Sequence, residues 1–326
     1  MRTIDFLDKR VTGICNELKK LSVKQKFETS DWLIKPGNFL RPEDADADPA
    51  PFEPFDSRTM HWYGPDKHYW FRADVTVPQE MDGKPLWMHV CTQIDEWDDA
   101  KNPQFLLFVD GKVTQGVDMN HRDILLDRCA KGGQKYRLEL QSYTGTLHTE
   151  FNLIVDLREI DPEIEGLYYD MVVPLEAFPR LEEDGKARRD LENVLNEAVN
   201  LIDLRTPYNE SFYQSIAAAR RLSWQKHFIT DLAGHEEVIA SCIGHTHIDV
   251  AWWWTVAQTR EKVCRSFATV LKLMDEYPNY KFMSSQPQLY YFLKQRYPEL
   301  YEQIKQRVRR DAGNPKAVCG LRQTAT

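Results

Sequence analysis

The chain has 326 residues, of which 42% are hydrophobic and 12% aromatic. This length and composition predict about two domains with well-packed cores. The formal net charge of −8 at pH 7 argues against nucleic acid or an anionic membrane surface as a partner. The N-terminal residues lack the apolar core of a signal peptide, and nowhere are there eighteen consecutive apolar residues. We therefore predict a soluble, cytoplasmic protein.

The six cysteines show neither paired C-x-x-C spacing nor the density of a disulfide scaffold. We expect them to be reduced thiols. Cys242 lies in a short apolar run that is expected to form a strand, and we expect it to be a small buried hydrophobic residue.

The N-terminal region begins with a helical pattern over residues 1–34, which is clearest between Asp5 and Leu21. A segment rich in Pro and Asp follows, from Pro36 to Pro54. It lacks the glycine and the terminal glutamate of an EF-hand loop, so we interpret it as an exposed turn region rather than a calcium site.

Short alternating runs separated by turns dominate from His61 to about Val173, and they predict a β-sandwich. The expected strands cover residues 69–77, 85–90, 105–109, 135–140 and 149–155. The dipeptide Asp110-Gly111 predicts a tight hairpin turn. The aromatic residues of this region are expected mainly in the core, although a carbohydrate-binding role stays open for four of them: Trp62, Tyr63, Trp70 and Trp97. Helices are expected from Leu181 to about Leu232.

An apolar run over residues 237–243 is typical of a strand buried on both faces, and polar residues follow at its C-terminal end. Because side chains alternate along a strand, His245, His247 and Asp249 are expected to point to one side. Imidazole and carboxylate groups that converge in this way can hold a divalent metal, and zinc accepts both kinds of ligand.

The elements after this motif continue in a βαβα order. A helix is expected over 259–277, a strand over 280–285 and a second helix over 288–309. This alternation predicts a parallel sheet or barrel, in which ligands bind at the C-terminal ends of the strands. Trp253 and Trp254 are expected to fill the core, and the charged Arg260 and Glu261 are expected to be solvated.

The sequence G-H-T-H-I-D-V-A-W-W-W-T-V-A-Q-T-R-E-K, the later S-S-Q-P-Q-L-Y and the helix Y-P-E-L-Y-E-Q-I-K resemble the opening of the catalytic domain of glycoside hydrolase family 38, the α-mannosidases. The resemblance is close over residues 236–309. A looser likeness extends to 105–126. It implies a multidomain α+β and α/β protein, in which an N-terminal β-sandwich with flanking helices precedes the first βα units of a (β/α) barrel-like domain.

The family assigns roles to the residues that match its motif. The resemblance implies that His247 and Asp249 are two of the four protein ligands of a zinc ion that binds sugar hydroxyls. Trp252 would stack on the mannose ring, and His245 would orient its neighbours without binding the metal. The implied reaction is retaining hydrolysis of terminal α-mannosyl residues. The implied partners are α-mannosides or mannose-containing oligosaccharides, and full-length members are expected to form homo-oligomers.

The C-terminal tail departs from the family. The resemblance ends near Arg309. One nucleotide string, with its codons chosen to fit, can encode two different sequences here. One reading frame gives the family-like G-R-W-E-P-E-G-G-M-W-V-E-A-D-C-N, and the frame one base later gives residues 311–326. We therefore predict an accessory and linker region over 1–235, the start of the catalytic domain over 236–310 and an out-of-frame tail over 311–326. The aspartate nucleophile of the family, which is also a metal ligand, would lie on a later strand, so a chain truncated in this way is expected to be inactive.

Two other hypotheses stay open at this stage. Other metal-dependent hydrolases with barrel folds also carry H-x-H on their first strand, and they use water activated on the metal. Alternatively, the chain is a non-catalytic fragment whose sandwich binds carbohydrate. The tryptophans directly after the motif favour the sugar enzyme.

Overall fold

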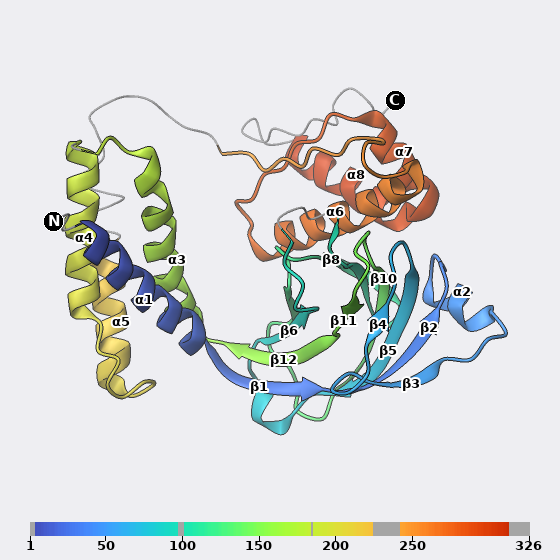
Figure 1. Ribbon diagram of the computed structural model, residues 1–326, viewed down its shortest axis with the longest axis horizontal. Coiled ribbons are helices and arrows are strands. Elements are labelled where there is room, and N and C mark those ends of the chain that lie inside the picture. Colours follow the sequence, from blue (N-terminus) through green and yellow to red (C-terminus); the bar gives the residue numbers. More distant parts are fainter. Residues whose placement is uncertain (1–3, 97–100, 184, 224–241, 313–326) are drawn as a thin grey trace. The chain divides into compact units, whose positions relative to one another are not determined.

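The computed structural model describes residues 4–96, 101–183, 185–223 and 242–312. It divides into two compact units, and Figure 1 labels the helices and most of the strands. The first unit comprises the described parts of 1–26 and 158–239, and the second comprises the described parts of 27–157 and 240–326. The mixture of helices and sheets agrees with the expected fold class. The domain boundaries expected at 235 and 310 stay predictions.

The first unit is helical. Its helices are α1 (Ile4–Ser22), α3 (Pro162–Ala177), α4 (Lys186–Leu201) and α5 (Glu210–Ser223), with a short 3-10 turn, η3 (Phe178–Arg180), after α3. α1 confirms the helix expected over 5–21, and α4 and α5 lie within the helical region expected from residue 181. The helices share one apolar core, built from residues that include Val11, Leu18, Leu167, Leu195, Phe212 and Ile216.

Helix α3 corrects the expectation that alternating strands continue to about Val173. The Asp161 side chain caps the helix by accepting hydrogen bonds from the backbone N–H groups of Glu163 and Ile164. Pro162 occupies the first helical position, where its missing N–H is no disadvantage. These start signals are local, and they outweigh the weak alternation in this stretch.

The sheets lie mainly in the second unit. A six-stranded sheet has the order β3 (Glu53–Asp56), β2 (Asp31–Pro36), β5 (His68–Thr76), β10 (Lys135–Tyr143), β7 (Gln104–Val109), β8 (Lys112–Val117). A four-stranded sheet has the order β1 (Val23–Thr29), β12 (Ile154–Ile160), β6 (Leu86–Cys91), β9 (Asp123–Asp127), and β11 (Glu150–Phe151) pairs with β4 (Trp62–Tyr63). The pairs β2–β3, β2–β5, β5–β10, β10–β7, β7–β8 and β6–β9 are antiparallel.

One hydrophobic core joins the two larger sheets. It takes Phe71 and Leu140 from the six-stranded sheet and Met88 and Ile124 from the four-stranded sheet. This arrangement agrees with the sandwich expected from the alternating runs. Trp62 belongs to the same core and is 2% exposed.

The other aromatic residues considered for carbohydrate binding fall in different places. Trp70 is fully buried, as expected, but it belongs to a second core. Tyr63 is exposed. Trp97 lies outside the described residues.

The hairpin expected at Asp110-Gly111 is confirmed. It joins β7 to β8, and both residues have positive φ angles, 50° and 76°. Two positive φ angles at the centre of a two-residue loop match the twist of the flanking strands.

Two segments of the N-terminal region differ from expectation. The expected helical pattern over 1–34 ends at Ser22, and β1 and β2 follow it. In β1 the side chains alternate between partly buried and exposed, which is the period of a strand and not of a helix. The expected turn region at 36–54 contains the short helix α2 (Pro42–Ala47), whose start is fixed by a hydrogen bond from the Arg41 backbone N–H to Asp44.

Three helices follow the candidate motif: α6 (Val256–Glu276), α7 (Pro287–Arg296) and α8 (Pro298–Ala312). The helix expected over 259–277 is confirmed, with an earlier start. The single helix expected over 288–309 is wrong, because Pro298 disfavours helical geometry at Tyr297 and divides the stretch into α7 and α8. α8 ends at Ala312, so it includes the first two residues of the expected out-of-frame tail.

The helices α6, α7 and α8 pack on the six-stranded sheet around the second core. This core includes Trp70, Leu106 and Phe108 from the sheet, with Phe267 and Leu293 from the helices. The strands β5 and β7 therefore bury residues on both faces.

The contact between α6 and β8 is especially close at Gly116. A Cβ atom at this position would lie 2.5 Å from the carbonyl oxygen of Arg265. The Thr269 hydroxyl donates a hydrogen bond to the Gly116 carbonyl oxygen at 3.1 Å. Glycine thus permits backbone contact between the helix and the hairpin.

The remaining short element of the sandwich is a 3-10 turn, η1 (Gln79–Met81).

None of the helices in the described ranges combines the length and the apolar character that crossing a lipid bilayer requires.

Candidate functional site

The candidate motif begins at a parallel β-bridge between Gly244 and Phe282. The Gly244 N–H donates to the Lys281 carbonyl oxygen at 2.7 Å, and the Met283 N–H donates to the Gly244 carbonyl oxygen at 2.9 Å. The strand expected over 280–285 is reduced to this bridge, because the described residues place no third strand beside it. The strand expected over 237–243 lies largely outside the described residues.

His247 and Asp249 come together just after the bridge. The His247 Nε2 atom lies 3.1 Å from the Asp249 Oδ1 atom. Their side chains are 69% and 43% exposed, whereas Ile248 between them is fully buried. The side chains therefore alternate as the sequence predicts, with the two candidate ligands turned outward.

His245 is exposed, and the structure does not bring it into a cluster with the other two candidate ligands. Among the residues that the structure describes, no three His, Cys, Asp or Glu side chains are grouped closely enough to hold a metal ion. The described part of the site therefore offers a pair of donors.

The three consecutive tryptophans surround the next turn of the chain. Trp252 is 68% exposed and Trp253 is 79% exposed, so the expectation that Trp253 fills the core is wrong. The ring of Trp252 packs edge-on against Trp253 and Trp254, with centroid distances of 5.8 and 5.9 Å. Only Trp254 is partly buried, as expected of a packing residue. The exposed indoles of Trp252 and Trp253 form an aromatic surface. In the sequence, they follow shortly after His247 and Asp249.

Thr259 anchors this segment through hydrogen bonds of its side-chain hydroxyl. Its hydroxyl lies 2.6 Å from the Val250 carbonyl oxygen, to which it donates, and accepts a hydrogen bond from Trp254 Nε1 at 3.0 Å. Thr259 is fully buried. Its hydroxyl also lies 3.3 Å from the Asp249 carbonyl oxygen. One buried hydroxyl therefore connects the start of α6 to the backbone of a candidate metal ligand.

Two further groups fix the same segment. Gln286, at the start of α7, donates from Nε2 to the Ile248 carbonyl oxygen at 3.0 Å. A capping box starts α6: Thr255 accepts from the Gln258 N–H through its hydroxyl, and Gln258 accepts from the Thr255 N–H through its side chain. Both ends of the motif are thus tied to helix starts.

Glu261 corrects another expectation, because it is buried and not solvated. It is 6% exposed, and its carboxylate lies 3.0 Å from His68 Nε2 on β5 and 3.4 Å from Asn38 Nδ2. Burial by itself raises the pKa of Glu261, but the hydrogen bond from His68 and the positive charge of Arg265 outweigh burial and lower it. The carboxylate is therefore held ionised between α6 and the sheet.

Of the two remaining expectations near the motif, one is confirmed and the other is wrong. Arg260 is exposed, as expected, and its guanidinium lies over the ring of Phe292 at 4.9 Å. Cys242 is exposed, so the expectation that it is a buried hydrophobic residue is wrong.

The supporting residues Thr259, Gln286 and Glu261 were not among the site residues chosen from the sequence. The T-x-x-Q spacing of Thr255 and Gln258 was a visible sign that a helix starts there, and it places Thr259 in the first turn. No local signal points to the partner of Glu261, because His68 is 193 residues away.

The segment thus presents a histidine, an aspartate and exposed indoles directly before a helix. The family model described as "Glycosyl hydrolases family 38 N-terminal domain" matches residues 237–316. This range contains the whole motif and its supporting helices. It also extends a few residues past the expected frame change at 310.

Curated relatives match a longer part of the chain. The "Alpha-mannosidase" of Saccharomyces cerevisiae is 31% identical over 71% of this chain and 24% of its own length. "Alpha-mannosidase G" of Dictyostelium discoideum is 24% identical over 78% of this chain and 24% of its own length. The human "Alpha-mannosidase 2C1" is 26% identical over 73% of this chain and 23% of its own length.

The chain belongs to glycoside hydrolase family 38 and matches the N-terminal part of its α-mannosidases. It spans about a quarter of the length of the curated relatives it matches. Among solved structures, a β-glucuronidase from Ruminococcus gnavus aligns with 42% of this chain and 30% of its own, at 10% identity and a TM-score of 0.28. A likeness at this level carries no weight for fold or function.

Proposed function

We propose that residues 244–254 form part of a zinc-assisted α-mannosidase site. The observation that carries the proposal is the outward pair of His247 and Asp249, followed directly by the exposed indole of Trp252. The substrate class is a terminal α-mannosyl residue, cleaved with retention of configuration. Membership of family 38 favours this reaction over that of other hydrolases with an H-x-H motif.

His247 and Asp249 carry donor atoms of the kind that zinc binds, and both side chains are accessible to a metal ion. Zinc accepts an imidazole nitrogen and a carboxylate oxygen, and a catalytic zinc site needs further ligands and an open position. The exposure of both side chains leaves room for ligands from elsewhere in a longer protein. A bound zinc ion would supply a Lewis acid that grips adjacent sugar hydroxyls.

The chain's own residues contribute binding and orientation. Trp252 presents an apolar ring face, which can cover the largely C–H face of a sugar and exclude water from it. Thr259 and Gln286 hold the backbone on either side of Asp249, so the carboxylate and the indole keep a fixed spacing. His245 is proposed to orient its neighbours without binding the metal.

Zinc titration of the full chain, followed by calorimetry, tests the metal assignment. We expect His247→Ala and Asp249→Ala each to weaken binding by at least about tenfold, since even an indirect partner of a ligand is worth about 10–100-fold. His148→Ala is the matched control, because His148 is an exposed histidine on the sandwich. Equal zinc affinities for all three variants would refute the assignment.

An aryl α-mannoside assay with added zinc tests catalysis. The 326-residue polypeptide by itself is predicted not to turn over, because the nucleophilic aspartate of the family is expected outside it. Turnover that is lost in Asp249→Asn would support the mannosidase site and overturn that prediction. Turnover that survives this substitution would contradict the role of Asp249.

We also propose a cytoplasmic location. All five described cysteines are free thiols, which is compatible with a reducing compartment. Fractionation of cells that express the protein, with an antibody against the chain, measures this directly.

A further inference from the structure

A cysteine, a histidine and an aspartate lie together on the sandwich, far from the mannosidase motif in the sequence. His89 and Cys91 are two residues apart on β6, so their side chains leave the same face of the strand. Asp123 on β9 is the register partner of His89. The Asp123 Oδ1 atom lies 2.7 Å from His89 Nδ1, and the imidazole also hydrogen-bonds the thiol of Cys91.

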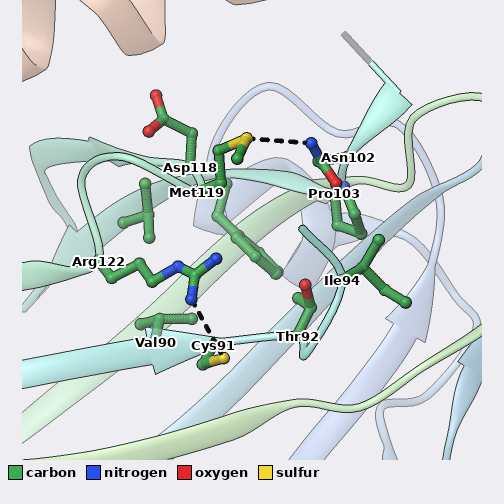
Figure 2. A pocket seen from close by; sticks show the side chains of 11 residues that line it. Val90, Cys91, Thr92, Ile94, Asn102, Pro103, Asp118, Met119 and Arg122 are labelled. Carbon is green, nitrogen blue, oxygen red and sulfur yellow. Dashed lines mark hydrogen bonds between the residues drawn. The ribbon is translucent and has the colours of Figure 1, made fainter. Parts of the chain in front are cut away.

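Further donors surround the sulfur. The Gln93 backbone N–H points at Cys91 Sγ at 3.3 Å, and Arg122 Nη1 lies 3.6 Å from it. Figure 2 shows the Arg122 side chain reaching towards Cys91. Arg122 is itself held by an ion pair with Asp95, and Asp118 at the end of β8 lines the same hollow. The groups nearest the sulfur are therefore donors, while the carboxylates are paired with His89, Arg122 and His121.

A small hollow opens beside these groups. It is lined by Cys91 and Arg122, by the apolar side chains of Ile94 and Met119, and by Asn102 (Figure 2). Its free space is about that of a water molecule. A small reagent can therefore approach the sulfur, whereas a bulky one would have to displace the walls.

We propose that Cys91 is a nucleophilic thiolate that reacts with small electrophiles such as hydrogen peroxide. His89 takes the thiol proton, and Asp123 orients the imidazole and stabilises its charged form. The same division of labour among nucleophile, base and orienting carboxylate activates thiols and hydroxyls elsewhere. The site is separate from the proposed mannosidase site and does not depend on it.

The reaction with peroxide balances without any other reactant. The thiolate sulfur attacks one oxygen of hydrogen peroxide, an S–O bond forms, and the O–O bond breaks. The sulfur loses two electrons and becomes a sulfenic acid. The departing hydroxide takes the proton held by His89 and leaves as water.

The charges around each cysteine support a difference in reactivity within one molecule. The hydrogen bond from His89 lowers the pKa of Cys91, and Arg122 contributes in the same direction. Burial raises the pKa of Cys15 to about 11 and that of Cys264 to about 12. These two thiols are almost fully buried, so they report on whether a variant is folded.

The test is the rate at which each cysteine of the full chain is alkylated by iodoacetamide between pH 5 and 9, followed by peptide mass spectrometry. Cys129, which is exposed, is the internal reference. At pH 6 we expect Cys91 to react about tenfold faster than Cys129, because a larger share of it is thiolate. A Cys91 rate that follows the same pH curve as Cys129, or lies below it, would overturn the proposal.

Two variants separate activation from simple exposure. His89→Gln is expected to lower the rate of Cys91 at pH 6 about tenfold and to move its midpoint to higher pH, and Asp123→Asn is expected to do the same to a smaller extent. Cys129 should not change in either variant. If Cys15 and Cys264 become reactive, the variant is unfolded, and the wild-type pH curve then decides alone. After hydrogen peroxide, a sulfenic-acid trap should label Cys91 ahead of Cys129, and preferential labelling of Cys129 would contradict the assignment.

Discussion

The segment from His245 to Trp254 and the first turns of α6 are adjacent in the chain but have opposite surroundings. In the segment, the side chains of His247, Trp252 and Trp253 are exposed. In α6, the polar Thr259 and Glu261 are buried, and each has several hydrogen-bond partners. The groups that would touch a ligand are open, while the groups that hold them are enclosed.

This contrast indicates which part of the site the described residues complete by themselves. We call the buried groups that hold the segment, Thr259 and Glu261, its support. The support is complete, because the hydroxyl of Thr259 and the carboxylate of Glu261 have their hydrogen-bond partners within the second unit. The proposed ligand-binding surface, with His247 and Trp252, is exposed. Substitutions in the support should therefore change stability, whereas substitutions in the open segment should change binding.

The largest effect is expected from Glu261→Ala. It leaves His68 and Asn38 without their buried acceptor and Arg265 without its buried carboxylate partner, and loss of one partner of a buried ion pair costs about 3–5 kcal/mol. Urea unfolding followed by circular dichroism, with hydrogen exchange of α6 amides, measures the loss.

The control for Glu261→Ala is Glu302→Ala on α8, where an exposed pair with Lys305 is broken. Its free energy of unfolding should stay close to that of the unsubstituted chain. Similar losses in the two variants would show that the enclosed support is no more important than the surface.

A smaller loss is expected from Thr259→Val, which keeps the shape of the side chain and removes its hydroxyl. Trp254 Nε1 and the Val250 carbonyl oxygen then lose a buried partner, at a cost of about 1–3 kcal/mol. Thr259→Ser should recover most of it. Because the hydroxyl holds Asp249, zinc affinity should fall in Thr259→Val as well, and unchanged affinity with unchanged tryptophan emission would contradict the positioning role.

Acid should weaken the support of the segment through protonation of Glu261. The pKa of Glu261 in the folded chain lies below its usual value of 4.5, so its ionised form stabilises the fold fully above that pH. The contribution is lost as the pH falls through the lowered pKa. Between pH 5 and 3 the hydrogen-exchange protection of α6 should fall, and less so in Glu261→Gln; an equal fall in both would argue against Glu261 as the cause.

The smallest effect on stability is expected from Trp253→Ala. An indole that is 79% exposed buries little surface, so the free energy of unfolding should change by no more than about 0.5 kcal/mol. Trp70→Ala, in the second core, should cost about 3–5 kcal/mol. Chemical denaturation of both variants makes the comparison, and a large loss in Trp253→Ala would show that the segment is packed against a surface.

Local patterns explain which elements could be predicted from the sequence. The hairpin at Asp110-Gly111 needs two positive φ angles, and that dipeptide supplies them. The division between α7 and α8 was also readable at Pro298, although the apolar period continues across it. The alternation of His247, Ile248 and Asp249 matches the one predicted, although these residues follow the bridge at Gly244 and do not themselves form a strand.

What the sequence did not predict depends on distant partners. The charge of Glu261 suggested solvent, but its burial depends on His68, which is on another strand. The size of Trp253 suggested the core, but nothing in the described second unit covers it. The N-terminal strand β1 was missed because its alternation is mild and follows a strong helical pattern.

The backbone contact at Gly116 sets the distance between α6 and the hairpin of β7 and β8. Any side chain at this position would act as a spacer between β8 and Arg265, because the nearest atoms are backbone and cannot rotate away. The displacement would be passed along a stiff helix towards Glu261 and Thr259. A single methyl group in the sandwich would therefore shift the segment at residues 244–254, although the two are more than a hundred residues apart in the sequence.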